Sequence, residues 1–259
     1  MLKGLYTGWT GMLNEQNRLD VVSNNLANSA TVGFKKEGAT SQTFKEALAY
    51  KIKDASENPN IAKRIGANTP GVKIGETYTN YDQGPMKETG NSTDFAISGN
   101  GFFNIEYTDA DGNTSTKYTR AGDFIVDADR YLVTSEGNRV LDTNGRAIRT
   151  ATTGGAIQTA ADGTIYQDGT RVAQIGITDF TDYNYLEHFG DTLFTATEGA
   201  TEQPATVKVN AGYLENSNVE IIKEMVDMIA IQRAYESGQK VIQTQDGALD
   251  IAVNQLGKL

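Results

Sequence analysis

Apolar residues recur at alternating spacings of three and four near both ends of the chain, and this repeat is missing from the middle. Such spacing places one apolar stripe along an α-helix, as in the seam of a coiled coil. The positions of the two repeats are Leu2, Leu5, Trp9, Met12, Gln16, Leu19, Ser23 and Leu26 at the start, and Ile221, Met225, Met228, Gln232, Tyr235, Gln239, Ile242, Asp246, Leu249, Val253 and Leu256 at the end. The pattern predicts two long amphipathic helices, which either pair and assemble with other copies or pack on an ordinary core.

Residue types at the borders of the repeats predict where the helices begin and end. Asn and Gly readily adopt the left-handed conformation that ends a helix, so Asn28 and Gly33 predict that the first helix ends near Leu26. Asn216–Asn218 contains good N-cap residues for the second helix, which we expect to reach about Leu256. All four prolines lie between the two repeats, and this keeps both helices uninterrupted.

The segment that follows the first helix has mixed features. Thr43–Lys53 has helical content, and Glu57–Asn60 and Asn68–Gly71 have the composition of turns. We interpret residues 34–75 as a connecting arm.

Residues 76–212 carry the signals of a β-rich domain. Short runs of β-branched and aromatic residues predict strands at 102–107, 116–119, 124–126, 131–134 and 139–141. Asp-Gly or Asn-Gly pairs at 111–112, 144–145, 162–163 and 168–169 predict hairpin turns. The predicted fold is therefore α+β, with this central domain flanked by two helices, residues 1–33 and 213–259, that pair as a coiled-coil-like module.

Composition narrows the possible partners. The net charge of -10 and the pI of about 4.7 argue against nucleic acid or an anionic membrane surface. Residues 1–75 carry a net charge of +4 and residues 213–259 a net charge of -3, so the ends attract each other weakly. No apolar run approaches the ~20 residues of a membrane helix. Asn14, Glu15 and Arg18 interrupt any signal-peptide core, so we expect no cleaved leader.

No set of residues predicts an active site. Gly99-Asn100-Gly101 lacks the third glycine of a dinucleotide loop, and the alternation at 109–113 lacks the glycine and glutamate positions of a calcium loop. His188 is the only histidine, and the chain has no cysteine for a thiolate metal site or a disulfide. We therefore expect no enzyme activity, no metal and no cofactor.

An asparagine-rich run at the end of the first helix needs a separate explanation, because asparagine is a poor helix former. Helix termination accounts for Asn28 but poorly for Asn24. Either these amides form hydrogen bonds across helices of an assembly, where buried polar groups fix the register, or they face water. Both interpretations stay open at the level of sequence.

Four motifs resemble those of the bacterial flagellar rod and hook proteins. They are Ser23-Asn24-Asn25-Leu26-Ala27-Asn28 with Thr31-Val32-Gly33-Phe34-Lys35, Asp94-Phe95-Ala96-Ile97-Ser98-Gly99-Asn100-Gly101-Phe102-Phe103, Tyr118-Thr119-Arg120-Ala121-Gly122-Asp123-Phe124, and Gly212-Tyr213-Leu214-Glu215-Asn216-Ser217-Asn218-Val219 with Glu224-Met225-Val226 and Gln232-Arg233-Ala234-Tyr235-Glu236. One departure is Arg130, where the family usually has Gly or Asn. The resemblance spans nearly the whole chain in order.

The resemblance implies a structural subunit of the flagellar basal body. Such a subunit would leave the cell unfolded through the flagellar export apparatus and polymerise into a hollow axial tube that transmits torque, with the terminal helices lining the channel. Its partners would be further copies and neighbouring rod and hook proteins. Length and the single middle domain favour a distal rod subunit, with a proximal rod or hook-type subunit as the alternative.

The expected assembly interface combines the two apolar stripes with the asparagine-rich run. Its residues are Leu5, Trp9, Met12, Leu19, Asn24, Asn25, Leu26, Asn28, Gly33, Phe34, Ile221, Met225, Met228, Gln232, Tyr235, Ile242, Leu249 and Val253. A rival interpretation from another class is a surface adhesin with a β-rich head on a coiled-coil stalk. That class needs an export leader and usually places its coil on one side of the head.

Overall fold

The computed structural model describes residues 2–44, 47–51, 63–68, 71–151, 157–205 and 207–254. The chain divides into two compact units. The helical unit comprises Met1–Leu26, Glu37–Thr79 and Ile221–Leu259, and the β unit comprises Ala27–Lys36 and Asn80–Glu220. Residues 27–33 and 213–220, which the sequence suggested would belong with the helices, are thus part of the β unit.

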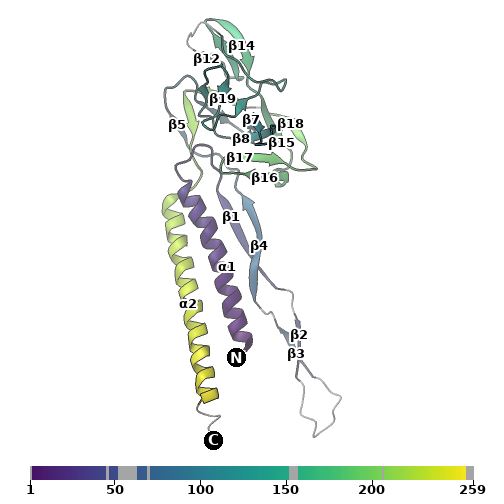
Figure 1. The fold of residues 1–259 in the computed structure, drawn as a ribbon, viewed down its shortest axis with the longest axis vertical. Coiled ribbons are helices and arrows are strands. Elements are labelled where there is room, and N and C mark those ends of the chain that lie inside the picture. Colours follow the sequence, from purple (N-terminus) through teal and green to yellow (C-terminus); the bar gives the residue numbers. More distant parts are fainter. Residues whose placement is uncertain are drawn as a thin grey trace. The chain divides into compact units, whose positions relative to one another are not determined.

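Two long helices form the terminal parts of the helical unit (Figure 1). Helix α1 spans Leu2–Ala27 and α2 spans Ile221–Asn254. The predicted α+β class, with helices at both ends and a β-rich middle, is confirmed. The first helix ends as expected, and Gly33 has a φ of 70°. The predicted extension of the second helix to Leu256 lies outside the described residues.

The arm between α1 and the β unit is made of strands. Strand β1 (Glu37–Thr43) pairs antiparallel with β4 (Val72–Thr79), and β2 (Ala47–Lys51) pairs antiparallel with β3 (Lys63–Asn68). The helical content expected for Thr43–Lys53 is therefore wrong wherever that segment is described, because pairing across the ribbon overrides a weak local preference. The turn expected at 57–60 lies outside the described residues.

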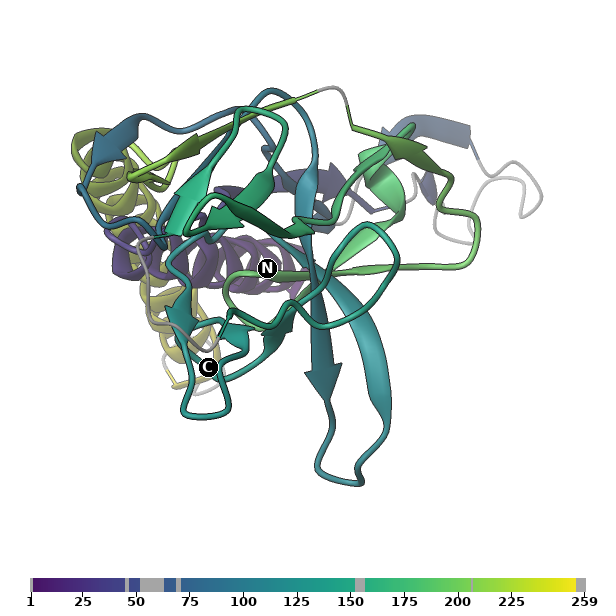
Figure 2. The ribbon, with the colours of Figure 1, turned by 90° about the horizontal axis from the view of Figure 1, so that it is seen from above.

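The β unit contains a nine-stranded sheet with the order β16-β17-β8-β7-β11-β10-β9, and β15 joins it by pairing with β7 and β18. Its predicted strands are confirmed as β7 to β11, and the four predicted turns each contain a glycine with positive φ. The bounds of the remaining elements are β5 (Met86–Glu88), β6 (Phe95–Ser98), β7 (Phe102–Thr108), β8 (Thr114–Thr119), β9 (Ile125–Val126), β10 (Leu132–Val133), β11 (Arg139–Val140), β12 (Ile157–Thr159), β13 (Thr164–Gln167), β14 (Thr170–Gln174), β15 (Ile177–Phe180), η1 (Tyr183–Tyr185), β16 (Leu186–Phe189), β17 (Leu193–Ala196), β18 (Glu202–Pro204), β19 (Lys208–Ala211) and β20 (Tyr213–Glu215). Figure 2 shows the β7–β8 hairpin extending away from the rest of this unit.

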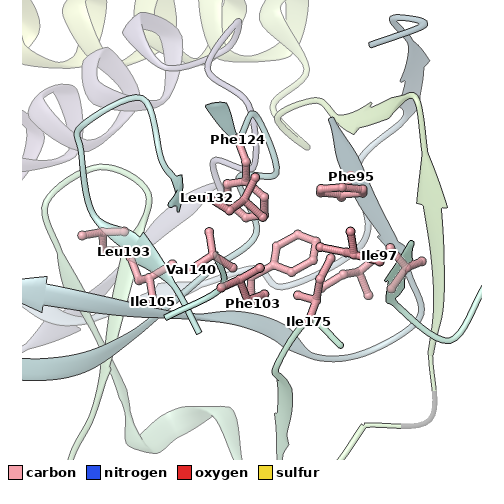
Figure 3. Close-up of a cluster of buried hydrophobic side chains, with 12 residues drawn as sticks. Phe95, Ile97, Phe103, Ile105, Phe124, Leu132, Val140, Ile175 and Leu193 are labelled. Carbon is pink, nitrogen blue, oxygen red and sulfur yellow. The ribbon is translucent and has the colours of Figure 1, made fainter. Parts of the chain in front are cut away.

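Strand β7 separates two hydrophobic clusters, because successive side chains of a strand point to opposite faces. Phe103 and Ile105 belong to the larger cluster, drawn in Figure 3 together with Phe95, Phe124 and Leu132. Phe102 belongs to the second cluster, with Tyr118, Phe180, Leu186 and Phe194. The β unit is thus built around a strand that is buried on both sides.

Arg130, the departure from the family motif, occupies a left-handed turn with a φ of 66°. A residue with a Cβ atom is strained in this region, by about 1 kcal/mol. We therefore expect Arg130→Gly to raise the free energy of unfolding by about 0.5–1 kcal/mol, measured by urea denaturation. Arg130→Ala, which removes the side chain but keeps the strain, is the control and should give no gain. An equal gain from both variants would contradict the explanation.

Candidate assembly interface

Helices α1 and α2 contact each other in antiparallel order within the helical unit. A Cβ atom built on Gly8 would lie 3.2 Å from Cγ1 of Ile242, and one on Gly238 would lie 2.7 Å from Cγ of Met12. Nearer the other end, Asn25 Nδ2 donates to Glu224 Oε2 at 3.4 Å. For two residues that face each other, one on α1 and one on α2, the two residue numbers therefore add up to about 250.

The seam of α2 repeats with spacings of three and four, like the predicted stripe, but at partly different positions. The less exposed side chains on this line are Glu224, Met228, Ile231, Tyr235, Gly238, Ile242, Gln245, Leu249 and Ala252. Met228, Tyr235, Ile242 and Leu249 belong to both the predicted stripe and this seam. The predicted positions that alternate with these four are each one residue beyond a seam position. The apolar pattern misplaced them because polar or small residues occupy part of the seam.

The remaining predicted positions of α2 lie outside this seam. Ile221, Met225 and Val253 are 45%, 48% and 70% exposed, and Gln232 is also exposed. On α1, Leu5, Met12, Leu19 and Leu26 are partly buried. Apolar residues on α2 thus occupy more than one face of the helix.

The β1–β4 ribbon contacts another face of α1. Asn14 Nδ2 donates to Ser41 Oγ at 3.1 Å, and a Cβ atom on Gly71 would lie 2.3 Å from Thr10 Oγ1. Thr10 and Asn14 are both buried. Helix α1 is therefore enclosed from two directions, by α2 and by the ribbon.

Asn25 explains part of the asparagine-rich run. Its Nδ2 donates to the carbonyl oxygen of Glu37 at 2.8 Å, and its Oδ1 accepts from the Glu37 N–H at 2.9 Å. With the bond to Glu224, this buried amide joins α1, the start of the ribbon and α2 within one chain. Asn24 is exposed, and Asn28, which begins the Asn28–Thr31 turn, is partly buried. Asn25 thus forms a cross-helix bond of the kind considered from the sequence, and that bond lies within one chain.

Large apolar side chains remain exposed on both helices. On α1 they are Tyr6, Trp9 and Leu13, with 44%, 51% and 44% of their surface accessible, and the rings of Tyr6 and Trp9 lie 5.9 Å apart. On α2, Ile222, Val226 and Ile229 are 80%, 59% and 52% exposed. A groove of about 460 Å³ also opens between the helices beside Leu19, Ile231 and Tyr235. Large exposed apolar side chains thus lie on both helices of the helical unit, and grouped exposed apolar residues are typical of surfaces that associate.

Gly33 and Phe34, also expected at the interface, are buried in the β unit. The Gly33 N–H donates to the carbonyl oxygen of Glu215 at 2.8 Å. Like Asn25, these two residues are buried and make contacts within the single chain.

Next to Gly33, the β unit contains a buried ion cluster that we call the 35–120–215 triad. Lys35 Nζ lies 2.6 Å from Glu215 Oε1, and Arg120 Nη1 lies 3.1 Å from Glu215 Oε2. The three side chains are only 1%, 4% and 0% exposed. Lys35 also donates to the Asp82 carbonyl oxygen, and Arg120 to the Gly99 carbonyl oxygen, both at 2.7 Å.

Burial and charge act in opposite directions on Lys35. Removal from water lowers the pKa of its ammonium group, and the Glu215 carboxylate partly offsets this shift by favouring the charged form. The triad joins the segment after α1, the residue that follows β8 and the last residue of β20. It therefore holds three stretches of chain together through one carboxylate.

The residues of the triad were visible in the sequence only as members of three of the motifs quoted above. A charged residue in an otherwise apolar or glycine-rich motif is the signal that could have pointed to them. The pairing itself was not predicted, because Lys35 and Glu215 are 180 positions apart.

Other kinds of site find no support among the described residues. No group of three or more His, Asp or Glu side chains in this part of the chain could hold a metal ion. His188 packs against the ring of Phe194, with centroids 4.6 Å apart. No helix in the described ranges is long and apolar enough to span a bilayer.

Three family models match the chain in order. Residues 5–35 match the flagella basal body rod protein, 96–172 match the D1 domain of the flagellar hook protein FlgE/F/G, and 210–256 match the C-terminal region of the flagellar basal body rod protein FlgEFG. These matches contain most of the motif residues on which the resemblance was based.

Curated relatives extend this similarity over the full length. The chain is 36% identical to flagellar basal-body rod protein FlgG of Bacillus subtilis, over 98% of this chain and 99% of the relative. It is 34% identical to flagellar basal-body rod protein FlgF of Caulobacter vibrioides, over the whole of both chains. FlgG of Agrobacterium fabrum is also 36% identical, over 98% of this chain and 100% of the relative.

Proposed function

This chain belongs to the flagellar basal-body rod protein family and is a structural, non-enzymatic subunit of the rod, and on this premise we propose that it builds the distal rod. In this proposal many copies polymerise into a hollow tube that transmits torque and leaves a channel for exported subunits. The rod family also implies assembly with other axial proteins of the flagellum.

The observation that carries the proposal is the similarity to FlgG proteins along 98% of the chain. The helical unit supplies a physical reason for polymerisation. Full burial of one Leu, Ile or Met side chain contributes about 1.5–3 kcal/mol. The exposed apolar residues of α1 and α2 are already partly covered, so each gains a part of this energy when another subunit covers it, and the tube is more stable than the separate chain.

We further propose that α1 and α2 act as a coiled-coil-like module. Seam positions of α2 alternate by three and four over nearly its whole length, which is the spacing of a heptad repeat. Export of the unfolded chain through the flagellar export apparatus is part of the same proposal.

Assembly and location test this function separately. Purified chain should form tubes on concentration, visible by electron microscopy, and a labelled copy should lie in the distal part of the rod in isolated basal bodies. Absence of tubes at every concentration, together with absence of label from basal bodies, would contradict the proposal.

The proximal rod is the second candidate, favoured by the 34% identity to FlgF over both full lengths. The same labelling experiment distinguishes the two positions. Label at the base of the rod would replace the distal assignment but keep the structural role.

Hydrogen exchange should report the change in the helices on assembly. We expect weak amide protection over residues 5–25 in the dilute monomer, because Tyr6, Trp9 and Leu13 of α1 are exposed there, and strong protection in tubes. The core strand β7 should be protected in both states and serves as the internal control. Strong protection of residues 5–25 in the monomer would contradict this explanation.

A further inference from the structure

Two exposed apolar triplets on the helical unit have matching spacings. The triplet on α1 is Tyr6, Trp9 and Leu13, with steps of three and four. The triplet on α2 is Ile222, Val226 and Ile229, with steps of four and three. When two helices run antiparallel, these steps coincide, so each side chain of one triplet faces one of the other.

The triplets cannot meet within one chain. Facing residues of α1 and α2 have numbers that add up to about 250, as for Gly8 and Ile242. Leu13 with Ile222, Trp9 with Val226, and Tyr6 with Ile229 each add up to 235 instead. The two triplets therefore lie at different levels along the helix pair, with the α1 triplet toward the N-terminus of α1 and the α2 triplet toward the opposite end.

We propose that the α1 triplet of one subunit docks on the α2 triplet of a second copy, with Trp9 at the centre of the contact. The inference rests on the proposed function, because it takes a polymer of this chain as given. Two different surfaces in contact form a heterologous interface, the type that generates open helical assemblies. Subunits of common polarity place α1 of one copy antiparallel to α2 of the next, as the matched spacing requires.

Chemistry and exposure favour a second copy as the occupant. All six side chains are uncharged, and each is at least 44% exposed in the single chain. The contact also continues an interface already present, since it pairs α1 with α2 as inside the chain, but shifted by 15 residues. That shift displaces neighbouring subunits by about 22 Å along the helix axis.

Cysteine cross-linking tests the pairing directly, because the chain has no native cysteine. Full-length Trp9→Cys and Val226→Cys are assembled separately and as a mixture, then oxidised mildly. We expect disulfide-linked dimers in the mixture and at least tenfold fewer in either variant alone. Ile251→Cys replaces Val226→Cys as the control, since Ile251 is 53% exposed but lies far along α2, and it should give no dimer with Trp9→Cys.

Efficient cross-linking between two copies of Trp9→Cys would overturn the proposal while leaving the rod function intact. So would the absence of cross-links in tubes assembled from the mixture of Trp9→Cys and Val226→Cys. Wild-type chain provides a second measurement that does not depend on the variants, because Trp9 is its only tryptophan. The fluorescence emission of Trp9 should shift to shorter wavelength in tubes, and iodide should no longer quench it. Full quenching in wild-type tubes refutes the docking, and failure of the wild-type chain to form tubes refutes the proposed function with it.

Discussion

Glu215→Gln is expected to lower the free energy of unfolding by about 3–5 kcal/mol, the usual cost of removing one partner from a buried ion pair. The substitution keeps the size of the side chain and an acceptor for the Gly84 N–H, which lies 2.9 Å from Glu215 Oε1. It removes the negative charge shared by Lys35 and Arg120, so two cations stay buried without a counterion. Urea denaturation followed by near-ultraviolet circular dichroism measures the loss.

Two further variants separate charge from packing. Glu198→Gln changes an exposed carboxylate to an amide and should shift stability by less than about 0.5 kcal/mol. The triple variant Lys35→Met, Arg120→Met, Glu215→Gln should recover part of the loss, because it removes both uncompensated cations and the amide still accepts from the Gly84 N–H. A loss below 1 kcal/mol for Glu215→Gln would show that the 35–120–215 triad contributes little.

Gly33→Ala should destabilise the β unit by about 2–5 kcal/mol through two effects that add. The left-handed φ of 70° costs a residue with a Cβ atom about 1–2 kcal/mol. The new Cβ atom would also lie 2.2 Å from the backbone nitrogen of Ala121 and 2.5 Å from the carbonyl carbon of Arg120, and such overpacking costs about 1–3 kcal/mol. Backbone atoms cannot move aside as a flexible side chain can.

Gly137→Ala is the matched control. Gly137 has a φ of 90°, but no atom lies within 4 Å of its added Cβ. This variant should therefore show only the conformational cost of about 1–2 kcal/mol. Thermal denaturation measures the loss of stability in both variants, and the difference between the two losses gives the contribution of the close approach. Equal losses would contradict that contribution.

Local signals in the sequence predicted the elements whose stability is local. Aromatic and β-branched runs between Asp-Gly or Asn-Gly turns identified β7 to β11, and the apolar repeats identified both helices. The β1–β4 ribbon was missed because its register depends on residues far apart in the sequence, from Thr43 and Val72 to Glu37 and Thr79. Pairing of that kind leaves no periodic pattern along a short segment.

The seam that α2 presents to α1 within one chain was predicted at some positions but not at others. Apolar periodicity located the seam through Met228 and Tyr235, yet it could not place Glu224 or Gln245 there, since both are polar. It also merged positions that face α2 with positions that remain exposed, because α1 and α2 carry apolar residues on more than one face. The burial of each side chain in the folded structure is needed to distinguish the positions that face the other helix from those that remain exposed.

The position of Glu215 also has a consequence during synthesis. This residue is the shared counterion of Lys35 and Arg120, and it lies near the end of the sequence. A nascent chain on the ribosome cannot close the cluster until most of the polypeptide has been translated. Prematurely terminated products that lack Glu215 therefore retain two uncompensated cations, which keeps them open and accessible to cellular proteases.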